Sequence, residues 1–162
     1  MDSILTRFYD SVETYGDERT KNLFLMDQPL TILAICAGYV ALVKYIGPKF
    51  MENRKPFELN RLMMLYNFAQ VVFNAWLFRE LLSSGWGNDY SYKCQPNDPS
   101  TSGKALRMAF ACHLFFLSKF TDFIDTFFFI LRKKNSHISA LHVIHHATTP
   151  ISGKSKKKSA HL

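Results

Sequence analysis

Cysteine is scarce in this sequence, and the cysteines present fit no common metal or redox pattern. The 162 residues include three cysteines. No C-x-x-C pair occurs, which excludes a zinc site built on that spacing. Cys36 and Cys112 lie in apolar runs and are interpreted as small hydrophobic residues. Cys94 lies in a polar stretch and has no partner in another loop of this chain.

Two further features are missing. Residues 1–21 carry too many charges for the apolar core of a signal peptide, so we expect no such peptide here. No internal repeat is visible, which excludes a repeat architecture. The length allows one domain.

Charge and apolar residues are strongly segregated along the chain. The net charge of +7 and the isoelectric point near 9.4 would suit a nucleic-acid-binding protein or a membrane protein with basic cytosolic loops. Hydrophobic residues make up 48% of the chain, with 15 phenylalanines, yet the mean hydropathy is −0.07. Long apolar runs therefore alternate with charged stretches, which favours the membrane protein.

Three apolar segments are long enough to cross a bilayer, which needs about 20 helical residues. They cover residues 29–46, 62–82 and 105–131, and a shorter stretch at 138–151 begins a further buried helix. These runs are hydrophobic on all sides, unlike the apolar stripe of a surface helix. The sequence thus predicts an all-α, polytopic membrane helical bundle. The alternative is a soluble helical bundle with an unusually apolar core.

The basic loops predict the orientation in the membrane. Cations gather between the first two segments and after the third, whereas the loop at 83–104 holds only Lys93 and Lys104. The positive-inside rule places the basic loops in the cytosol, and the N-terminus and the Cys94 loop in the lumen. There Cys94 would be a free thiol or would form a disulfide with something outside this sequence. Residues 154–162 are a basic tail, expected to be disordered and solvated or to touch anionic lipid.

The stretch KFTDFIDT inside the third segment places three charged residues where membrane insertion is energetically unfavourable. Charges in a membrane span cost about 3 kcal/mol each even on the lower scales. On a helix, Lys119, Asp122, Asp125 and Thr126 fit an arc of about 120°, so they can all face a bundle interior. Lys119 and Asp122 are three residues apart and can pair. They form either a buried ion pair that fixes packing or a polar functional site.

Three histidines follow in LHVIHHATTP. His142, His145 and His146 share one helical face, and three imidazoles so close make a purely structural role a weak explanation. They could bind metal, but a dinuclear iron site needs several histidine boxes and this chain has one. They could instead act covalently, because a neutral imidazole attacks a thioester and its neighbours can move protons. The other histidines, His113, His137 and His161, are interpreted as structural or without a role.

Taken together these motifs resemble the ELO family of very-long-chain fatty acid elongases. HVIHH preceded by DTFFFILRKK, KFTDFIDT, YNF at 66–68, FRELLSSGW at 78–86 and YSYKCQPND at 90–98 carry the resemblance. KFTDFIDT is similar to the family motif K-x-x-E-x-x-D-T, with Asp122 in place of the usual glutamate. The later family motifs are absent. The resemblance therefore implies residues 1–153 to be the first half of a seven-helix domain, C-terminally truncated, with the usual disulfide partner of Cys94 in the missing half.

The resemblance implies an endoplasmic-reticulum, multi-pass enzyme of very-long-chain fatty acid elongation. Its members condense a long-chain acyl-CoA with malonyl-CoA to 3-oxoacyl-CoA, CO2 and CoA, and neither a metal nor a cofactor is implied. His145 would accept the acyl group, with His142 and His146 orienting it or moving protons. The substrate-binding residues implied are Lys119, Asp122, Asp125, Thr126, Arg132, Lys133 and Lys134.

Some alternatives remain open. Arg132, Lys133 and Lys134 could bind CoA phosphates or simply mark the cytosolic side. The chain could be inactive alone and act as a non-catalytic membrane subunit that pairs with full-length elongases or other enzymes of the elongation cycle. It could also be a histidine-box, metal-dependent lipid desaturase or hydroxylase.

Overall fold

A computed structural model describes residues 19–87, 90–93 and 100–152, and these residues form helices and connecting loops without a β-strand. The all-α fold class is therefore confirmed. The predicted tail at 154–162 and Cys94 lie outside the described residues. The elements are α2 (Pro29–Ala41), η1 (Leu42–Ile46), α3 (Gly47–Met51), α4 (Asn60–Leu81), η2 (Leu82–Trp86), α5 (Gly103–Thr121), α6 (Phe123–Leu131), η3 (Asn135–His137) and α7 (Ala140–Ser152).

The first predicted segment is a continuous helix over Pro29–Met51, formed by α2, η1 and α3. It is the one helix among the described residues that is both long and apolar enough to cross a membrane. Pro29 stands at its start, where a missing N–H costs nothing. The π-helical turn η1 ends two residues before Pro48, which cannot donate a helical hydrogen bond, and a wider turn before a proline is one way to keep the helix continuous. The helix therefore runs five residues past the predicted end at Ile46.

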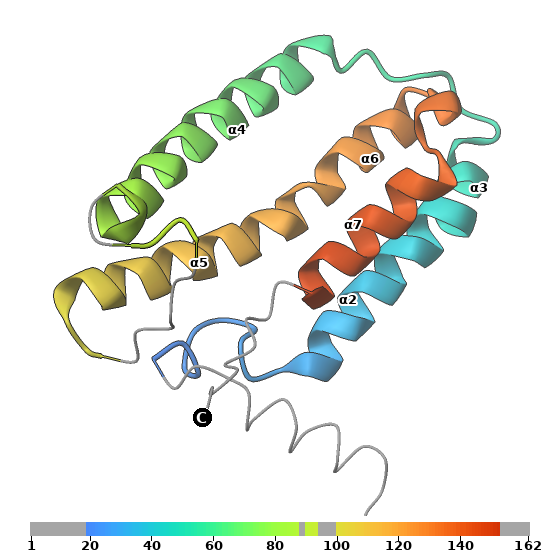
Figure 1. Ribbon diagram of the computed structural model, residues 1–162. Helices are drawn as coiled ribbons and strands as arrows, with labels where there is room; N and C mark the ends of the chain where they lie inside the picture. The colour runs from blue at the N-terminus through green and yellow to red at the C-terminus, as the bar shows by residue number, and fades with distance from the viewer. Residues whose placement is uncertain (1–18, 88–89, 94–99, 153–162) are drawn as a thin grey trace, which may run out of the picture.

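The second and fourth predicted segments are also helical. Segment 62–82 corresponds to α4 with the short η2 turn, and segment 138–151 corresponds to α7. The prediction of one unbroken helix over 105–131 needs correction, because the chain is divided at Asp122 into α5 and α6. The backbone of Asp122 keeps right-handed helical angles, so the break is a local interruption within one long rod (Figure 1).

The core lies where the first helix, α5, α6 and α7 meet. α7 contacts both α2 and α5, and α6 contacts α3 (Figure 1). The buried core side chains come from all of these elements and from the segment before α2: Leu25, Ile32, Cys36, Tyr39, Val43, Met51, Phe116, Phe123, Ile130 and Val143. α4 contacts α5 and lies on the other side of the α5–α6 rod.

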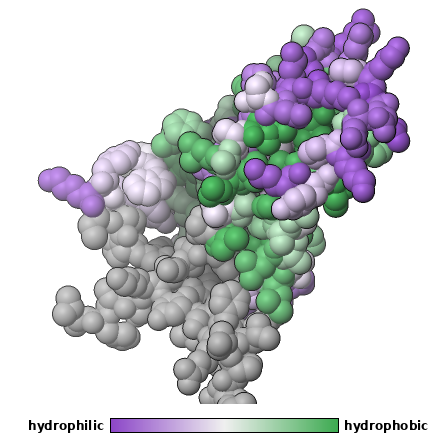
Figure 2. Space-filling model, turned by 90° about the vertical axis from the view of Figure 1, so that its right-hand side faces the viewer, coloured by the Kyte–Doolittle hydropathy of each residue, from purple (hydrophilic) through white to green (hydrophobic). Residues whose placement is uncertain are grey.

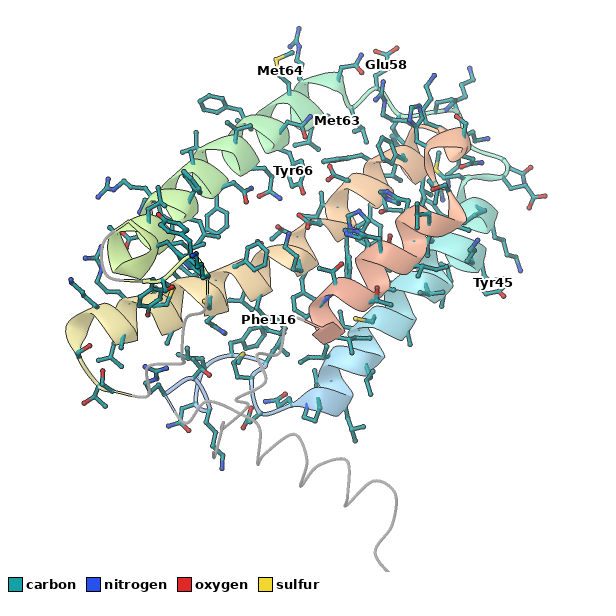
Figure 3. The ribbon with its side chains drawn as sticks, viewed as in Figure 1. Tyr45, Glu58, Met63, Met64, Tyr66 and Phe116 are labelled. Atoms are coloured by element: carbon teal, nitrogen blue, oxygen red, sulfur yellow. The ribbon has the colours of Figure 1, made fainter. Side chains whose placement is uncertain are left out.

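Helix α4 leaves a broad apolar surface uncovered. Met64 is 71% exposed and Phe68 is 67% exposed, and the nearby Leu65 and Val71 are also exposed. Met64 points away from the other helices, whereas Tyr66 points toward the α5–α6 rod (Figure 3). Contiguous apolar surface of this kind is typical of a face that meets lipid or another protein.

The two basic loops meet at one end of the bundle. Phe57 donates its backbone N–H to the Leu131 carbonyl at 3.0 Å. The Arg132 guanidinium donates to Asn60 Oδ1 at 2.9 Å, and Lys133 Nζ donates to the Glu52 carbonyl at 3.1 Å. Hydrophilic side chains gather at this end, above apolar sides (Figure 2). The two loops therefore lie at the same end of the bundle, as expected if both face the same side of a membrane.

Candidate active site

The predicted ion pair in KFTDFIDT is present. Lys119 Nζ lies 3.0 Å from Asp122 Oδ2, and the two side chains are 20% and 26% exposed. Lys119 also lies over the Phe115 ring, 4.7 Å from its centroid. Asp122 is thus both the partner of Lys119 and the residue at the helix break, so the charge pair marks the junction of α5 and α6.

Helix α4 contacts this junction through a small polar cluster that the sequence reasoning missed. Tyr66 donates its hydroxyl proton to the Thr121 carbonyl at 2.9 Å. The Gln70 amide donates to Tyr66 Oη at 2.9 Å and to Thr121 Oγ1 at 3.1 Å. These bonds satisfy polar groups of Thr121 next to the break. YNF was singled out for its resemblance alone, and the i, i+4 spacing of Tyr66 and Gln70 is the signal that could have indicated a joint role.

Thr126 links the two predicted motifs directly. Its hydroxyl oxygen lies 2.9 Å from His142 Nε2 on α7. The same oxygen lies 2.9 Å from the Tyr39 hydroxyl on α2. Thr126 is fully buried, at 0% exposure. A single hydroxyl therefore joins three helices. Tyr39 is a further residue that sequence reasoning missed, because an isolated tyrosine in an apolar run carries no local signal.

The three histidines differ in their surroundings. The rings of His142 and His146 are 4.3 Å apart between centroids, and those of His145 and His146 are 5.4 Å apart. His142 and His146 are half-buried, whereas His145 is exposed. The Thr149 hydroxyl donates to the His145 carbonyl at 2.6 Å. The histidines do share a face, and among the described residues His142 is the one of the three whose ring itself takes part in a hydrogen bond.

The remaining predicted residues fall into two groups. Asp125 is half-buried and interacts electrostatically with Asp122, and the Lys119–Asp122 pair is within electrostatic range of His146. These residues belong with the histidines. Arg132 and Lys133 lie instead at the basic end, where Arg132 bonds to Asn60 at the start of α4 and Lys133 bonds to the α3–α4 loop, and Lys134 is exposed next to them.

Two other histidines lie away from the motif histidines: His113 was interpreted as structural, and His137 was given no role. His113 is 5% exposed and packs near Phe116, and His137 stacks on Phe129 with 5.2 Å between ring centroids. His161 lies outside the described residues. Within residues 19–87, 90–93 and 100–152, no three His, Cys, Asp or Glu side chains are grouped so as to hold a metal ion.

The sequence matches a known protein family over most of its length. Residues 24–153 match the ELO family, described as the GNS1/SUR4 family. The chain belongs to the ELO family. As an ELO protein it is a membrane protein, in agreement with the apolar Pro29–Met51 helix.

Curated proteins similar to this ELO chain are named very long chain fatty acid elongases. One from Aedes aegypti is 52% identical over 155 residues, which cover 93% of this chain and 43% of the relative. Elongase 7 of Drosophila melanogaster is 48% identical over 152 residues, which cover 91% of this chain and 46% of the relative. Human elongase 1 is 41% identical, with 90% and 52% covered. The chain therefore spans about half the length of the curated relatives it matches.

Proposed function

We propose that this ELO chain takes part in the condensation step of very-long-chain fatty acid elongation. In that step a long-chain acyl-CoA and malonyl-CoA give 3-oxoacyl-CoA, CO2 and CoA. The observation that carries the proposal is the bond between Thr126 and His142, which brings the KFTDFIDT and HVIHH motifs into one polar site. The names of the relatives support the same activity.

His145 is the proposed nucleophile. Its ring is exposed, so a thioester can approach it, and a neutral imidazole nitrogen is a competent nucleophile. A new N–C bond to the acyl carbonyl would form as the C–S bond breaks, and the CoA thiolate would take up a proton. Malonyl-CoA would then lose CO2, and its α-carbon would attack the acyl group and free His145. His146, in ring contact with both neighbours, is placed to orient His145 and to move protons.

The charged residues have separate proposed roles. Lys119, Asp122 and Asp125 would line the polar site beside the histidines. Arg132, Lys133 and Lys134 would lie on the cytosolic side of a multi-pass chain in the endoplasmic reticulum. Because Arg132 already bonds to the start of α4 and Lys133 to the α3–α4 loop, we favour the exposed Lys134 as the one of the three that would meet CoA phosphates. A metal and a cofactor play no part in this proposal.

The test uses membranes that contain this chain, supplied with malonyl-CoA and labelled long-chain acyl-CoA, with a full-length relative in parallel. We expect 3-oxoacyl products, and acyl label bound to the protein when malonyl-CoA is withheld. His145→Ala should abolish both signals, while His137→Ala, a change at an exposed histidine stacked on Phe129, should leave them unchanged. Label retained in His145→Ala would reject the nucleophile.

A second candidate function is a non-catalytic subunit that pairs with full-length elongases. The uncovered apolar face of α4 favours it, because such a face can bind another membrane helix. Co-purification with a full-length relative, together with absent elongation by the chain alone, would support this candidate. Stoichiometric iron in the purified protein would instead favour a lipid desaturase or hydroxylase.

A further inference from the structure

Tyr39 of α2 is buried beside the proposed site. Its side chain is 3% exposed, and its ring stacks on Phe123 with 4.2 Å between centroids. Its hydroxyl lies 2.9 Å from Thr126 Oγ1, which in turn lies 2.9 Å from His142 Nε2. Three polar groups from α2, α6 and α7 thus form one chain in an apolar core.

The directions of these hydrogen bonds follow from counting donors. A phenol hydroxyl has one proton, and within the described residues Thr126 is the partner of Tyr39. If Thr126 donated to Tyr39, the Tyr39 proton would be buried without an acceptor, at the cost of an unsatisfied polar group. Tyr39 therefore donates to Thr126.

Thr126 must then place its own proton. Threonine hydroxyls in helices often donate to a carbonyl of the preceding turn, as those of Thr148 and Thr149 do in α7. Among the described residues, no backbone carbonyl accepts a hydrogen bond from Thr126, whose hydroxyl contacts side chains of two other helices instead. The acceptor that remains for its proton is His142 Nε2. A nitrogen that accepts carries no proton, so a neutral His142 must be protonated at Nδ1.

We infer that Tyr39 is a positioning residue that acts through Thr126 to fix His142 in the tautomer protonated at Nδ1. This inference rests on the proposed function for its chemical meaning. With Nε2 engaged, the one group that the neutral ring can offer to a substrate is the Nδ1–H donor. His142 then serves as a hydrogen-bond donor to a developing negative charge on the acyl oxygen, and the proton transfers fall to His146.

Without the Tyr39 hydroxyl, the donor and acceptor in the Thr126–His142 hydrogen bond are no longer fixed. A threonine hydroxyl with no donor beside it can accept from an Nε2–H group or donate to a bare Nε2 nitrogen. Tyr39→Phe keeps the ring that stacks on Phe123 and removes only the hydroxyl. Tyr45→Phe is the matched control, because Tyr45 lies on the same continuous helix, is 73% exposed and points away from the other helices (Figure 3).

The experiment is 15N NMR of the full chain labelled at histidine, in lipid nanodiscs and at a pH where the rings are neutral. The His142 signals are assigned by their loss in His142→Gln. We expect an unprotonated Nε2 and a protonated Nδ1 in the wild type and in Tyr45→Phe, and a mixture of both tautomers in Tyr39→Phe. Thr126→Ser, which keeps the hydroxyl, should retain the single tautomer, and Thr126→Val should lose it.

Two results would overturn the inference. One is a protonated Nε2 at His142 in the wild type, and the other is a Tyr39→Phe spectrum unchanged from that of Tyr45→Phe. If Tyr39→Phe fails to fold, the comparison of Thr126→Ser with Thr126→Val decides the question. The measurement requires no turnover, so a chain without elongase activity would fail the proposed function while leaving the tautomer result standing.

Discussion

The contact between α4 and the break in the α5–α6 rod gives a sharp stability prediction. Tyr66→Phe removes one oxygen atom and keeps the ring, whose edge packs on Phe128 with 5.5 Å between centroids. The change deletes the donor to the Thr121 carbonyl and the acceptor for the Gln70 amide. Hydrogen bonding is therefore altered while apolar packing is conserved.

The expected cost follows from what these two groups lose. A hydrogen bond whose partner is left unsatisfied costs about 1–3 kcal/mol. The bond from Tyr66 to the Thr121 carbonyl is exposed rather than sealed in the core, so water can partly replace the lost donor, and the lower part of this range applies. Gln70 keeps its second bond to Thr121 Oγ1 at 3.1 Å. We expect Tyr66→Phe to lower the free energy of unfolding by about 1–2 kcal/mol.

The measurement is thermal unfolding of the chain in detergent, followed by tryptophan fluorescence. At about 2–4 °C for each kcal/mol in a chain of this size, Tm should fall by about 2–8 °C. Gln70→Leu alone should also lower Tm, and the double variant should lose less than the sum, because both side chains bond to Thr121. If Tm of Tyr66→Phe equals that of the exposed control Tyr45→Phe, the cluster does not stabilise the break.

Two further predictions concern packing and charge. A Cβ atom on Gly47 would lie 2.9 Å from Ile130 Cγ2, so Gly47→Ala should lower Tm. Gly38 has open space around it, so Gly38→Ala should raise the free energy of unfolding by up to about 1 kcal/mol. Lys119→Met leaves the Asp122 carboxylate without its 3.0 Å partner and should cost about 1–3 kcal/mol in chemical denaturation. The reversed pair Lys119→Asp with Asp122→Lys should recover part of that loss, and a double variant no better than Lys119→Met would contradict a stabilising ion pair.

Features encoded within one segment were predictable from the sequence. The four apolar runs are helical in the structure, the third as α5 and α6, because apolar runs longer than a strand are typical of helices. The pairing of Lys119 with Asp122 followed from a spacing of three residues, which places both side chains on one face of a turn. The face shared by His142 and His146 followed from the same periodicity, and their rings do meet.

Features that depend on another helix were not predictable. Nothing near Tyr39 or Tyr66 in the sequence says that each hydroxyl meets a residue more than fifty positions away. The break at Asp122 was not predicted either, because KFTDFIDT contains neither proline nor glycine to interrupt a helix. Thr121, next to the break, bonds both to α4 and to the Ser118 carbonyl of its own helix, and its sequence position does not indicate the contact with α4.

The three histidines share a face but differ in their contacts, and the sequence does not show this difference. At 100° per residue His142 lies between His145 and His146 on this face, and sharing one face does not give the three rings the same neighbours. His142 lies on the side that meets α6 and is bound by Thr126, whereas His145 is exposed. The periodicity therefore grouped the three residues correctly but could not say which of them is fixed and which is open to a substrate.

The chain from Tyr39 through Thr126 to His142 has consequences for how variants of this site should be read. A buried hydroxyl is tolerated in an apolar interior only when its hydrogen bonds are complete, so each member of the chain depends on the other two. Removing Thr126 Oγ1 strands a phenol on one side and an imidazole on the other, and therefore perturbs α2 and α7 together. A loss of activity in Thr126→Val would consequently combine a stability effect with a tautomer effect. Thr126→Ser separates the two, because it restores the hydroxyl while giving up the packing of one methyl group, and only a chemical role for the hydroxyl predicts that it regains activity without regaining full stability.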